Sequence, residues 1–289
     1  MKVGRSNLPW TTIKLARTIR KWLSGLFRTS TPESNRPNWR GVYQQFADVP
    51  TLGSGFDDHA WASDTRRLTE RALRECSIPN RLPLVEDDNT LLPVLVANIL
   101  CTGSSRIKVL DFGGGMGISF VHLIASVSQP DRIEYHVIET PQVCREGAEL
   151  FSNDTRIHFH SRLPDAIDGV DVVYMNSALQ YIEDYRGLLR ALCDLSPRFI
   201  LLARCSAGNI ATYATAQLTL PGKQLPYWFI DVRELVSILG ECHYTPAFMA
   251  RGSYSVNQMN FAEEHQIGST CNLLFCRARN GRHPLIAPR

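Results

Sequence analysis

The sequence predicts an α/β protein built on a doubly wound, mostly parallel sheet, and two observations support this. From residue 106 onward, short apolar runs alternate with amphipathic helical patterns, as expected when helices connect parallel strands. One of these runs, residues 108–111, ends in an acid and leads directly into a glycine-rich segment at 112–117. A strand, a glycine turn and a helix start in this order are typical of the ligand-binding edge of such a sheet.

The elements follow in order along the chain. With 289 residues, 44% of them hydrophobic, the chain is long enough for one large core and requires no second independent domain. Helices are expected at 58–76 and 89–100, before the sheet begins. Seven apolar runs are predicted to be strands, namely 108–111, 133–138, 157–160, 170–176, 199–203, 242–250 and 272–277.

The glycine-rich segment predicts a cofactor loop. Gly113, Gly115 and Gly117 occupy every second position, and glycine lets the backbone approach a ligand closely because it tolerates positive φ and has no Cβ. This spacing is G-x-G-x-G, which differs from the dinucleotide pattern G-x-G-x-x-G. Asp111 stands two residues before the first glycine, where a carboxylate can accept hydrogen bonds but would repel a diphosphate. The pattern favours a cofactor with an amino-acid end and no phosphate.

A second carboxylate supports an adenosine cofactor. The predicted strand 133–138 delivers Glu139 at its carboxyl end, 28 residues after Asp111. In nucleotide-binding sheets of this kind, an acid at the end of the second strand binds the ribose hydroxyls. This position is shared by cofactors such as S-adenosylmethionine (SAM) and NAD, so Glu139 does not choose between them.

These motifs resemble motif I of class I SAM-dependent methyltransferases, in which the acid and the glycines hold the methionine part of the cofactor. The chain further resembles a bacterial family of such methyltransferases from polysaccharide and specialised-metabolite gene clusters, mostly without assigned substrates. This resemblance covers roughly residues 38–278 and rests on residues 39–43, Phe46 and Ala47, 111–117, 136–139, 171–173 and 179–181. It implies SAM as the cofactor and a Rossmann-like class I methyltransferase fold, with a seven-stranded, mostly parallel sheet, helices on both faces and an N-terminal helical extension.

The ends of the predicted strands supply the remaining cofactor contacts, since ligands bind there in open α/β sheets. The resemblance implies that Ser161 and Arg162, after the third strand, contact adenine, and that Asn176 and Ser177, after the fourth, lie near the reactive sulfonium. The predicted cofactor-binding residues are therefore Asp111, Gly113, Gly115, Gly117, Glu139, Ser161, Arg162, Asn176 and Ser177.

Asn176, Tyr181 and Tyr43 are the predicted catalytic residues. A tyrosine such as Tyr181 can stabilise a sulfonium cation, although a place in the core is an equal alternative. Tyr43 belongs to an aromatic segment before the first strand, which either closes over the cofactor as a lid or packs the amino-terminal helices onto the sheet. Residues 206–229 are expected to contribute to the acceptor pocket.

Three functions are consistent with these residues. The first is methyl transfer from SAM to a small-molecule or saccharide acceptor. The second is cyclisation of SAM itself to azetidine-2-carboxylate with release of methylthioadenosine, which requires no acceptor pocket. The third is a non-catalytic SAM-binding protein that regulates a partner, because a fold does not by itself establish activity. The glycine spacing makes an NAD oxidoreductase a weaker alternative.

Charge and domain organisation add a basic amino-terminal segment. Nine Lys or Arg and one acid precede residue 41, against 22 and 27 in the remainder. Residues 10–28 are predicted to form a basic amphipathic helix that contacts an anionic membrane surface, binds a partner or packs on the catalytic domain. The predicted parts are 1–37 (helix and linker), 38–105 (helical lid region), 106–280 (SAM-binding domain) and 281–289 (tail).

Cysteine usage predicts a cytoplasmic protein with reduced thiols, which would be peripheral at the membrane if residues 10–28 bind there. No metal site is expected. Charges interrupt every apolar stretch, so neither a membrane span nor a secretory signal is expected. The eight cysteines include no C-x-x-C pair, and no His/Cys cluster has zinc-like spacing. His136, His158 and His160 lie in strand patterns and are expected to have core or surface roles. No RNA-binding motif is present, so no nucleic-acid partner is expected.

Overall fold

A computed structural model describes residues 37–53, 55–56, 59–78, 82–83, 85, 87–103, 105–164, 167–220 and 222–278. The predicted basic helix at 10–28 and the predicted tail at 281–289 lie outside the described residues. From Asn38 onward the described residues belong to a single structural unit. Within the described part of the chain, no helix is both long enough and apolar enough to span a membrane.

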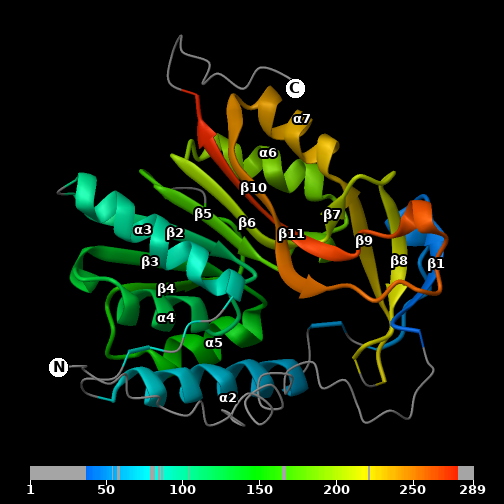
Figure 1. Cartoon of the computed structure of the whole chain (residues 1–289). Helices are drawn as coiled ribbons and strands as arrows, with labels where there is room; N and C mark the ends of the chain where they lie inside the picture. The colour runs from blue at the N-terminus through cyan, green and yellow to red at the C-terminus, as the bar shows by residue number, and fades with distance from the viewer. Residues whose placement is uncertain are drawn as a thin grey trace, which may run out of the picture. The chain divides into compact units, whose positions relative to one another are not determined.

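A seven-stranded sheet forms the centre of the molecule, with strand order β10-β11-β6-β5-β2-β3-β4 (Figure 1). Strands β4, β3, β2, β5 and β6 are parallel, whereas β11 runs antiparallel between β6 and β10. All seven predicted strands are confirmed. Their bounds are β2 (Ile107–Phe112), β3 (Ile133–Ile138), β4 (Ile157–His160), β5 (Val172–Asn176), β6 (Phe199–Cys205), β10 (Tyr244–Ser255) and β11 (Ser269–Arg277).

Helices pack on both faces of this sheet, because alternate strand residues point to opposite faces and form two separate apolar cores. Tyr135 and Val109 point into the first core, and Leu110 and Val173 into the second. The first face is covered by α2 (His59–Cys76), α3 (Leu91–Thr102), α4 (Ile118–Ser126) and α5 (Pro141–Leu150), and the second by α6 (Tyr185–Asp194) and α7 (Val232–Glu241). The helices predicted at 58–76 and 89–100 are confirmed as α2 and α3. The described residues also contain five 3-10 turns, namely η2 (Phe46–Asp48), η3 (Asp87–Thr90), η4 (Pro130–Arg132), η5 (Leu179–Tyr181) and η6 (Glu263–His265).

Local sequence signals fix where several helices begin. The Asp184 carboxylate accepts a hydrogen bond from the Gly187 backbone N–H at 2.8 Å and caps α6. Asp231 accepts from the Arg233 backbone N–H at 2.9 Å and caps α7 in the same way. These bonds satisfy amide groups that have no partner in the first helical turn. Helix α5 begins at Pro141, where the missing N–H costs nothing.

A second, smaller sheet was not predicted from the sequence. It has the order β1-β8-β9-β7, with β1 (Trp39–Tyr43), β7 (Ala207–Gly208), β8 (Tyr213–Gln217) and β9 (Leu225–Asp231). Trp39 is buried and packs its ring against Tyr227 at 4.6 Å and Phe229 at 4.9 Å between ring centroids. The predicted helical lid region 38–105 therefore begins with a strand, because these aromatic rings bury their area by pairing β1 with β8.

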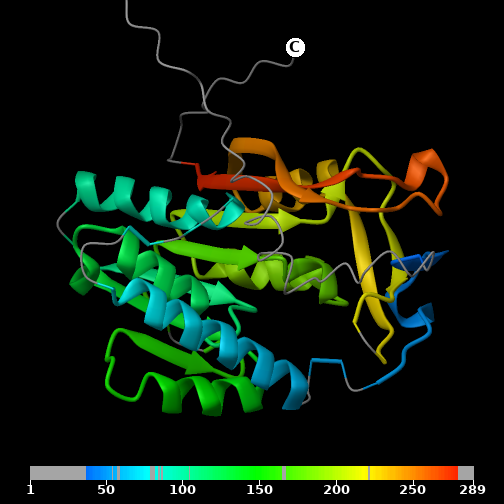
Figure 2. The same ribbon diagram turned by 60° about the horizontal axis from the view of Figure 1, so that its bottom comes forward.

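The small sheet stands at the carboxyl ends of the parallel strands. In Figure 2 the yellow strands β8 and β9 and the blue strand β1 lie beyond the arrowheads of the green strands. The insertion between β6 and α7, which includes the predicted acceptor region 206–229, is thus placed at the edge of the main sheet where ligands bind.

Two helical glycines make the packing of α5 testable. A Cβ at Gly147 would lie 2.5 Å from the Phe159 ring, whereas a Cβ at Gly240 in α7 meets nothing within 4 Å. Gly147→Ala should lower the free energy of unfolding by about 1–3 kcal/mol through overpacking. Gly240→Ala should raise it by about 0.5–1 kcal/mol, because alanine favours the helix. Urea unfolding of both variants measures the difference, and changes of the same sign would contradict the packing of α5 on β4.

Candidate functional site

The glycine loop after β2 adopts the backbone that its sequence predicts. Gly113, Gly115 and Gly117 have φ values of +73°, +56° and +82°, all in the left-handed region. Gly117 also precedes the first residue of α4, and its amide donates to the carbonyl of Gly114 at 3.1 Å. Residues with a Cβ would be strained at these positions, so the alternating glycines are a conformational requirement of the turn.

Asp111 is buried beside this loop. Its side chain is 1% exposed, and the Tyr135 hydroxyl donates a 2.7 Å hydrogen bond to Oδ2. Oδ1 is buried and has no hydrogen-bond partner among the described residues. A Cβ at Gly114 would overlap the carboxylate, so glycine is needed there for the loop to close over it. Burial raises the pKa of Asp111 to about 7, and the nearby Glu139 carboxylate adds to this while the Tyr135 hydrogen bond opposes it.

Glu139 meets the glycine loop from the next strand. Its Oε1 accepts a hydrogen bond from the Gly115 backbone N–H at 3.3 Å, and its Oε2 accepts from the Thr140 N–H at 2.8 Å. The strand ends themselves are tied together, because the Gly113 amide donates to the Ile138 carbonyl at 2.9 Å. The two carboxylates that the sequence singled out therefore share one side of the loop.

Helix α2 packs on the outside of the glycine loop. Thr65 is buried, and its methyl group lies 3.5 Å from the position of a Cβ at Gly115. Ala62 of α2 joins Met116 of the loop and Val143 of α5 in a small apolar cluster. The loop is therefore packed against both α2 and α5. The role of residues 38–105 as a lid over the cofactor stays a prediction.

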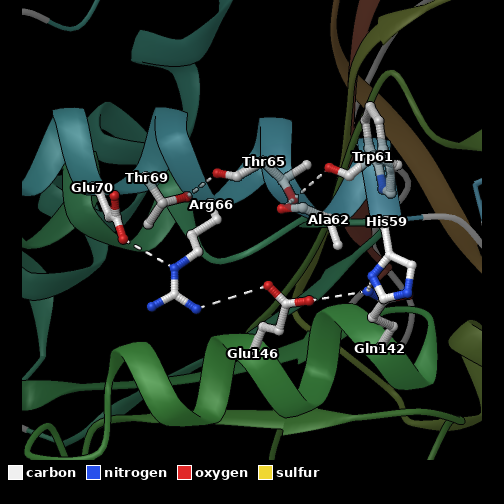
Figure 3. Close-up of polar contacts among 9 residues, drawn as sticks. All are labelled: His59, Trp61, Ala62, Thr65, Arg66, Thr69, Glu70, Gln142 and Glu146. Atoms are coloured by element: carbon white, nitrogen blue, oxygen red, sulfur yellow. Dashed lines mark hydrogen bonds and ion pairs between the residues drawn. The ribbon is translucent and has the colours of Figure 1, made fainter.

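Polar contacts fix α2 against α5 (Figure 3). Gln142 of α5 is 2.7 Å from His59 Nδ1 at the start of α2, and it also donates to Glu146 at 3.1 Å. Further along α2, Arg66 bonds Glu70 at 3.0 Å and lies 3.8 Å from Glu146. These pairs are exposed or half-exposed, so each contributes little energy to the contact between the two helices.

The carboxyl end of β5 brings Asn176 and Ser177 to the same edge. Asn176 donates a 2.8 Å hydrogen bond through Nδ2 to Asn89 Oδ1 in η3, and its own Oδ1 is buried without a partner among the described residues. Ser177 has φ of +57°, an unfavourable conformation for a residue with a side chain. The next residue, Ala178, lies 2.6 Å from the position of a Cβ at Gly113, so the end of β5 touches the glycine loop.

Tyr181 lies in an aromatic group formed by three separate segments. Its ring makes edge contacts with Phe56, before α2, and with Tyr227 in β9, each at 4.9 Å between centroids. Burial raises the pKa of Tyr181 well above its usual range, so its hydroxyl stays protonated at neutral pH. The Tyr227 hydroxyl is 2.5 Å from Ser206 Oγ. This aromatic group joins the end of β5, the small sheet and the segment before α2.

Three predicted site residues form no hydrogen bond with this loop among the described residues. Ser161 and Arg162 follow β4 and are exposed. Their strand end is linked to the site by the backbone, because the Glu139 amide donates to the His160 carbonyl at 3.1 Å. Tyr43 ends β1 and packs, half-buried, against the core on the α6 and α7 side of the sheet. Their assigned roles stay predictions.

Sequence reasoning missed residues that reach the site from distant elements. Thr65 and Asn89 come from the amino-terminal helical region, and neither carries a local pattern that marks it. Gln180 in η5, by contrast, belongs to the segment 179–181 that the sequence singled out. It is 1% exposed and donates to Ser177 Oγ at 3.0 Å, a partner that a buried amide needs.

Comparisons with known proteins identify the fold. No family model and no curated protein matches the sequence. A Haloferax volcanii protein, assigned as a methyltransferase and solved in complex with the Trm112 methyltransferase activator, is 12% identical, with 79% of this chain and 98% of that chain covered and a TM-score of 0.50. The chain has the class I methyltransferase fold. Its Rossmann-like, mostly parallel sheet with β11 antiparallel beside β6 agrees with this comparison.

Two further solved structures are similar at lower scores. Magnesium protoporphyrin IX methyltransferase from Synechocystis PCC 6803, with bound S-adenosylhomocysteine, is 13% identical over 77% of this chain and 96% of its own, with a TM-score of 0.48. The 1,6-didemethyltoxoflavin-N1-methyltransferase of Burkholderia thailandensis, with its substrate and S-adenosylhomocysteine, is 15% identical over 80% of this chain and 92% of its own, with a TM-score of 0.44.

The buried Asp111 carboxylate predicts a pH-dependent cost to stability. Its pKa is about 7 in the folded protein against 3.8 in the unfolded chain, so the cost is absent below about pH 4 and complete above about pH 7. Asp111→Asn should therefore gain stability over the wild type as pH rises through this window. The difference in unfolding free energy should approach about 2–4 kcal/mol at most, at about 1.4 kcal/mol per pKa unit.

Urea unfolding between about pH 4 and pH 8 measures this difference. Asp154→Asn is a control of opposite sign, because it should be less stable than the wild type at every pH in this range. Asp154 accepts hydrogen bonds from Arg156, which lower the pKa of Asp154. That carboxylate stabilises the fold above its unfolded pKa, and its contribution is lost as pH falls through the lower folded value. A difference between Asp111→Asn and wild type that does not change with pH would contradict the burial of an ionising carboxyl at this position.

Proposed function

We propose that this protein is a SAM-dependent methyltransferase that acts on a small-molecule acceptor. The observation that carries the proposal is the buried Oδ1 of Asp111, which has no hydrogen-bond partner in the described part of the chain. It lies beside the left-handed glycine loop, with the Glu139 carboxylate on the same side. A buried carboxylate without a cation is unfavourable, so a cationic ligand would offset its desolvation.

The residues present fit SAM better than a dinucleotide. SAM carries an α-ammonium and a sulfonium, both of which two carboxylates attract. A diphosphate would bring negative charge toward Asp111 and Glu139, whose mutual repulsion already raises the pKa of Asp111. The absence of side chains at Gly113, Gly114 and Gly115 lets the loop backbone approach such a ligand closely.

Each part of the cofactor would be held by a separate strand end. Asp111 and the glycine loop would hold the methionine part, and Glu139 the ribose hydroxyls. Ser161 and Arg162 would contact adenine, and Asn176 and Ser177 the end where the reaction occurs. The proposed assignment follows from the place of each residue at the carboxyl edge of the parallel strands.

When bound, SAM supplies an activated methyl group on a sulfonium, so the protein needs mainly to align the nucleophile and exclude water. The hydrogen bond from Asn176 Nδ2 to Asn89 orients the carboxamide and leaves Oδ1 available to accept a hydrogen bond from the nucleophile. We assign Tyr181 to stabilising positive charge through its ring and hydroxyl. We assign Tyr43 to the cover over the site.

The aromatic group around Tyr181 favours one class of acceptor. Phe56 and Tyr227 meet its ring edge to face at the carboxyl ends of the strands. Aromatic rings bind flat or CH-rich surfaces, which include heterocycles and the apolar faces of sugar rings. A small molecule or saccharide of this kind is therefore the proposed acceptor. A cytoplasmic location and contact of residues 10–28 with a membrane surface stay predictions from the sequence.

The deciding experiment is incubation of the full chain with SAM, with and without panels of candidate acceptors, followed by mass spectrometry of the nucleoside products. We expect S-adenosylhomocysteine only when an acceptor is present. Methylthioadenosine from SAM alone would overturn methyl transfer in favour of SAM cyclisation. Binding of SAM without any product across broad panels would instead favour the non-catalytic alternative.

Glu139→Ala tests the proposed ribose contact. Loss of a charged hydrogen-bond acceptor costs about 1.5–3 kcal/mol, so SAM affinity should fall about 10- to 100-fold. Isothermal titration calorimetry measures this, with Glu149→Ala, an exposed acid of α5, as the control that should bind normally. An unchanged affinity in Glu139→Ala would show that the ribose lies elsewhere.

A further inference from the structure

One face of β3 and β4 lacks a helical cover among the described residues. The chain between β4 and β5 forms no helix at 161–164 and 167–171, whereas α4 and α5 cover the opposite face of the same strands. A sheet face without a helix needs polar side chains in contact with water. Here those side chains are one glutamate and three histidines, namely Glu134, His136, His158 and His160.

The strand register brings these side chains together. His136 and His158 are direct cross-strand partners, and Glu134 and His160 follow at the i±2 positions that share the same face. The imidazole rings of His136 and His158 are stacked with centroids 4.9 Å apart, and His136 Nε2 is 2.9 Å from Glu134 Oε1. One potential ligand atom from each of Glu134, His136 and His158 lies within 4.8 Å of the others.

We propose that Glu134, His136 and His158 bind a divalent transition-metal ion of the zinc class. Two imidazoles and one carboxylate are a ligand set that zinc accepts, with water in the remaining position. Ligand atoms around tetrahedral zinc stand about 3.4 Å apart, given metal–nitrogen distances of about 2.0–2.1 Å. His158 is exposed, so its side chain has room to move toward the other two ligands when an ion binds.

The surrounding groups fit such a site. His136 is nearly buried, and its Nδ1 is 2.9 Å from His160 Nε2. A second hydrogen bond of this kind fixes the orientation of a metal-binding imidazole. Lys108 lies 3.2 Å from Glu134 Oε1, which leaves Oε2 for the metal. The ammonium would compete for the carboxylate, so we expect moderate affinity.

The site departs from the expectation of no metal, and the reason is topological. Its ligands come from two strands, and cross-strand pairs leave no fixed spacing in the sequence. The proposal does not depend on the proposed methyltransferase activity, because it lies on the opposite face of β3 from Tyr135, which bonds Asp111.

Metal binding is tested with untagged full-length protein treated with a chelator and then titrated with Co²⁺ and Zn²⁺. We expect one ion per chain, a cobalt spectrum of low coordination number without thiolate charge transfer, and a higher Tm with Zn²⁺. His158→Gln and Glu134→Gln should each weaken binding about 10- to 100-fold. The matched control is His243→Asn, which removes an exposed imidazole at a left-handed position that asparagine tolerates.

Lys108→Gln adds a test of opposite sign. Loss of the ammonium beside Glu134 should tighten metal binding, because the carboxylate is then free to pair with the ion. The proposal is overturned if the wild type binds no Co²⁺, if thiolate charge transfer shows cysteine ligands, or if His158→Gln binds as the wild type does. An unchanged affinity in Lys108→Gln would remove Glu134 from the site and overturn the three-residue set.

Discussion

The burial of one carboxylate, that of Asp111, constrains the structure around the proposed site. The Tyr135 hydroxyl satisfies one oxygen, and the loop passes over the group only because Gly114 has no Cβ. Helix α2 then packs on that loop through Thr65. The carboxylate, the loop and α2 are thus packed one against the next, and the carboxylate at the centre keeps one oxygen without a partner among the described residues. A cationic ligand is the simplest way to offset the cost of burying that oxygen.

The sequence predicted the elements whose signals are local. The central strands β2, β5 and β6 are nearly continuous apolar runs, because both of their faces are buried between helices. The glycine loop could also be predicted, because alternating glycines directly after a strand favour a turn with positive φ, and the structure has this turn. Glu139 was found because it directly follows a strand, and the edge of a parallel sheet gathers such residues.

The features that the sequence did not predict depend on contacts between distant segments. Strand β1 pairs with β8, with Trp39 opposite Gln217, and neither segment has an alternating pattern that marks a half-buried strand. Strand β8 is fully buried, and β1 buries Trp39 among the aromatic rings of the small sheet, a contact that forms only when the two segments meet. The hydrogen bond between Asn89 and Asn176 could not be predicted either, because nothing in the sequence indicates that two amides so far apart in the chain meet.

Strand β3 links the two sites through its alternation. Tyr135 points to one face and holds Asp111, while Glu134 and His136 point to the other and meet His158. Because consecutive side chains of a strand face opposite ways, a metal ion on one face would not compete with a cationic ligand on the other. It would instead link the short edge strand β4 to β3. Strand β3 contains Tyr135, and Glu139 follows its last residue. A metal ion bound on the uncovered face would thus stabilise the strands that carry the ligand-binding edge without occupying the cofactor site.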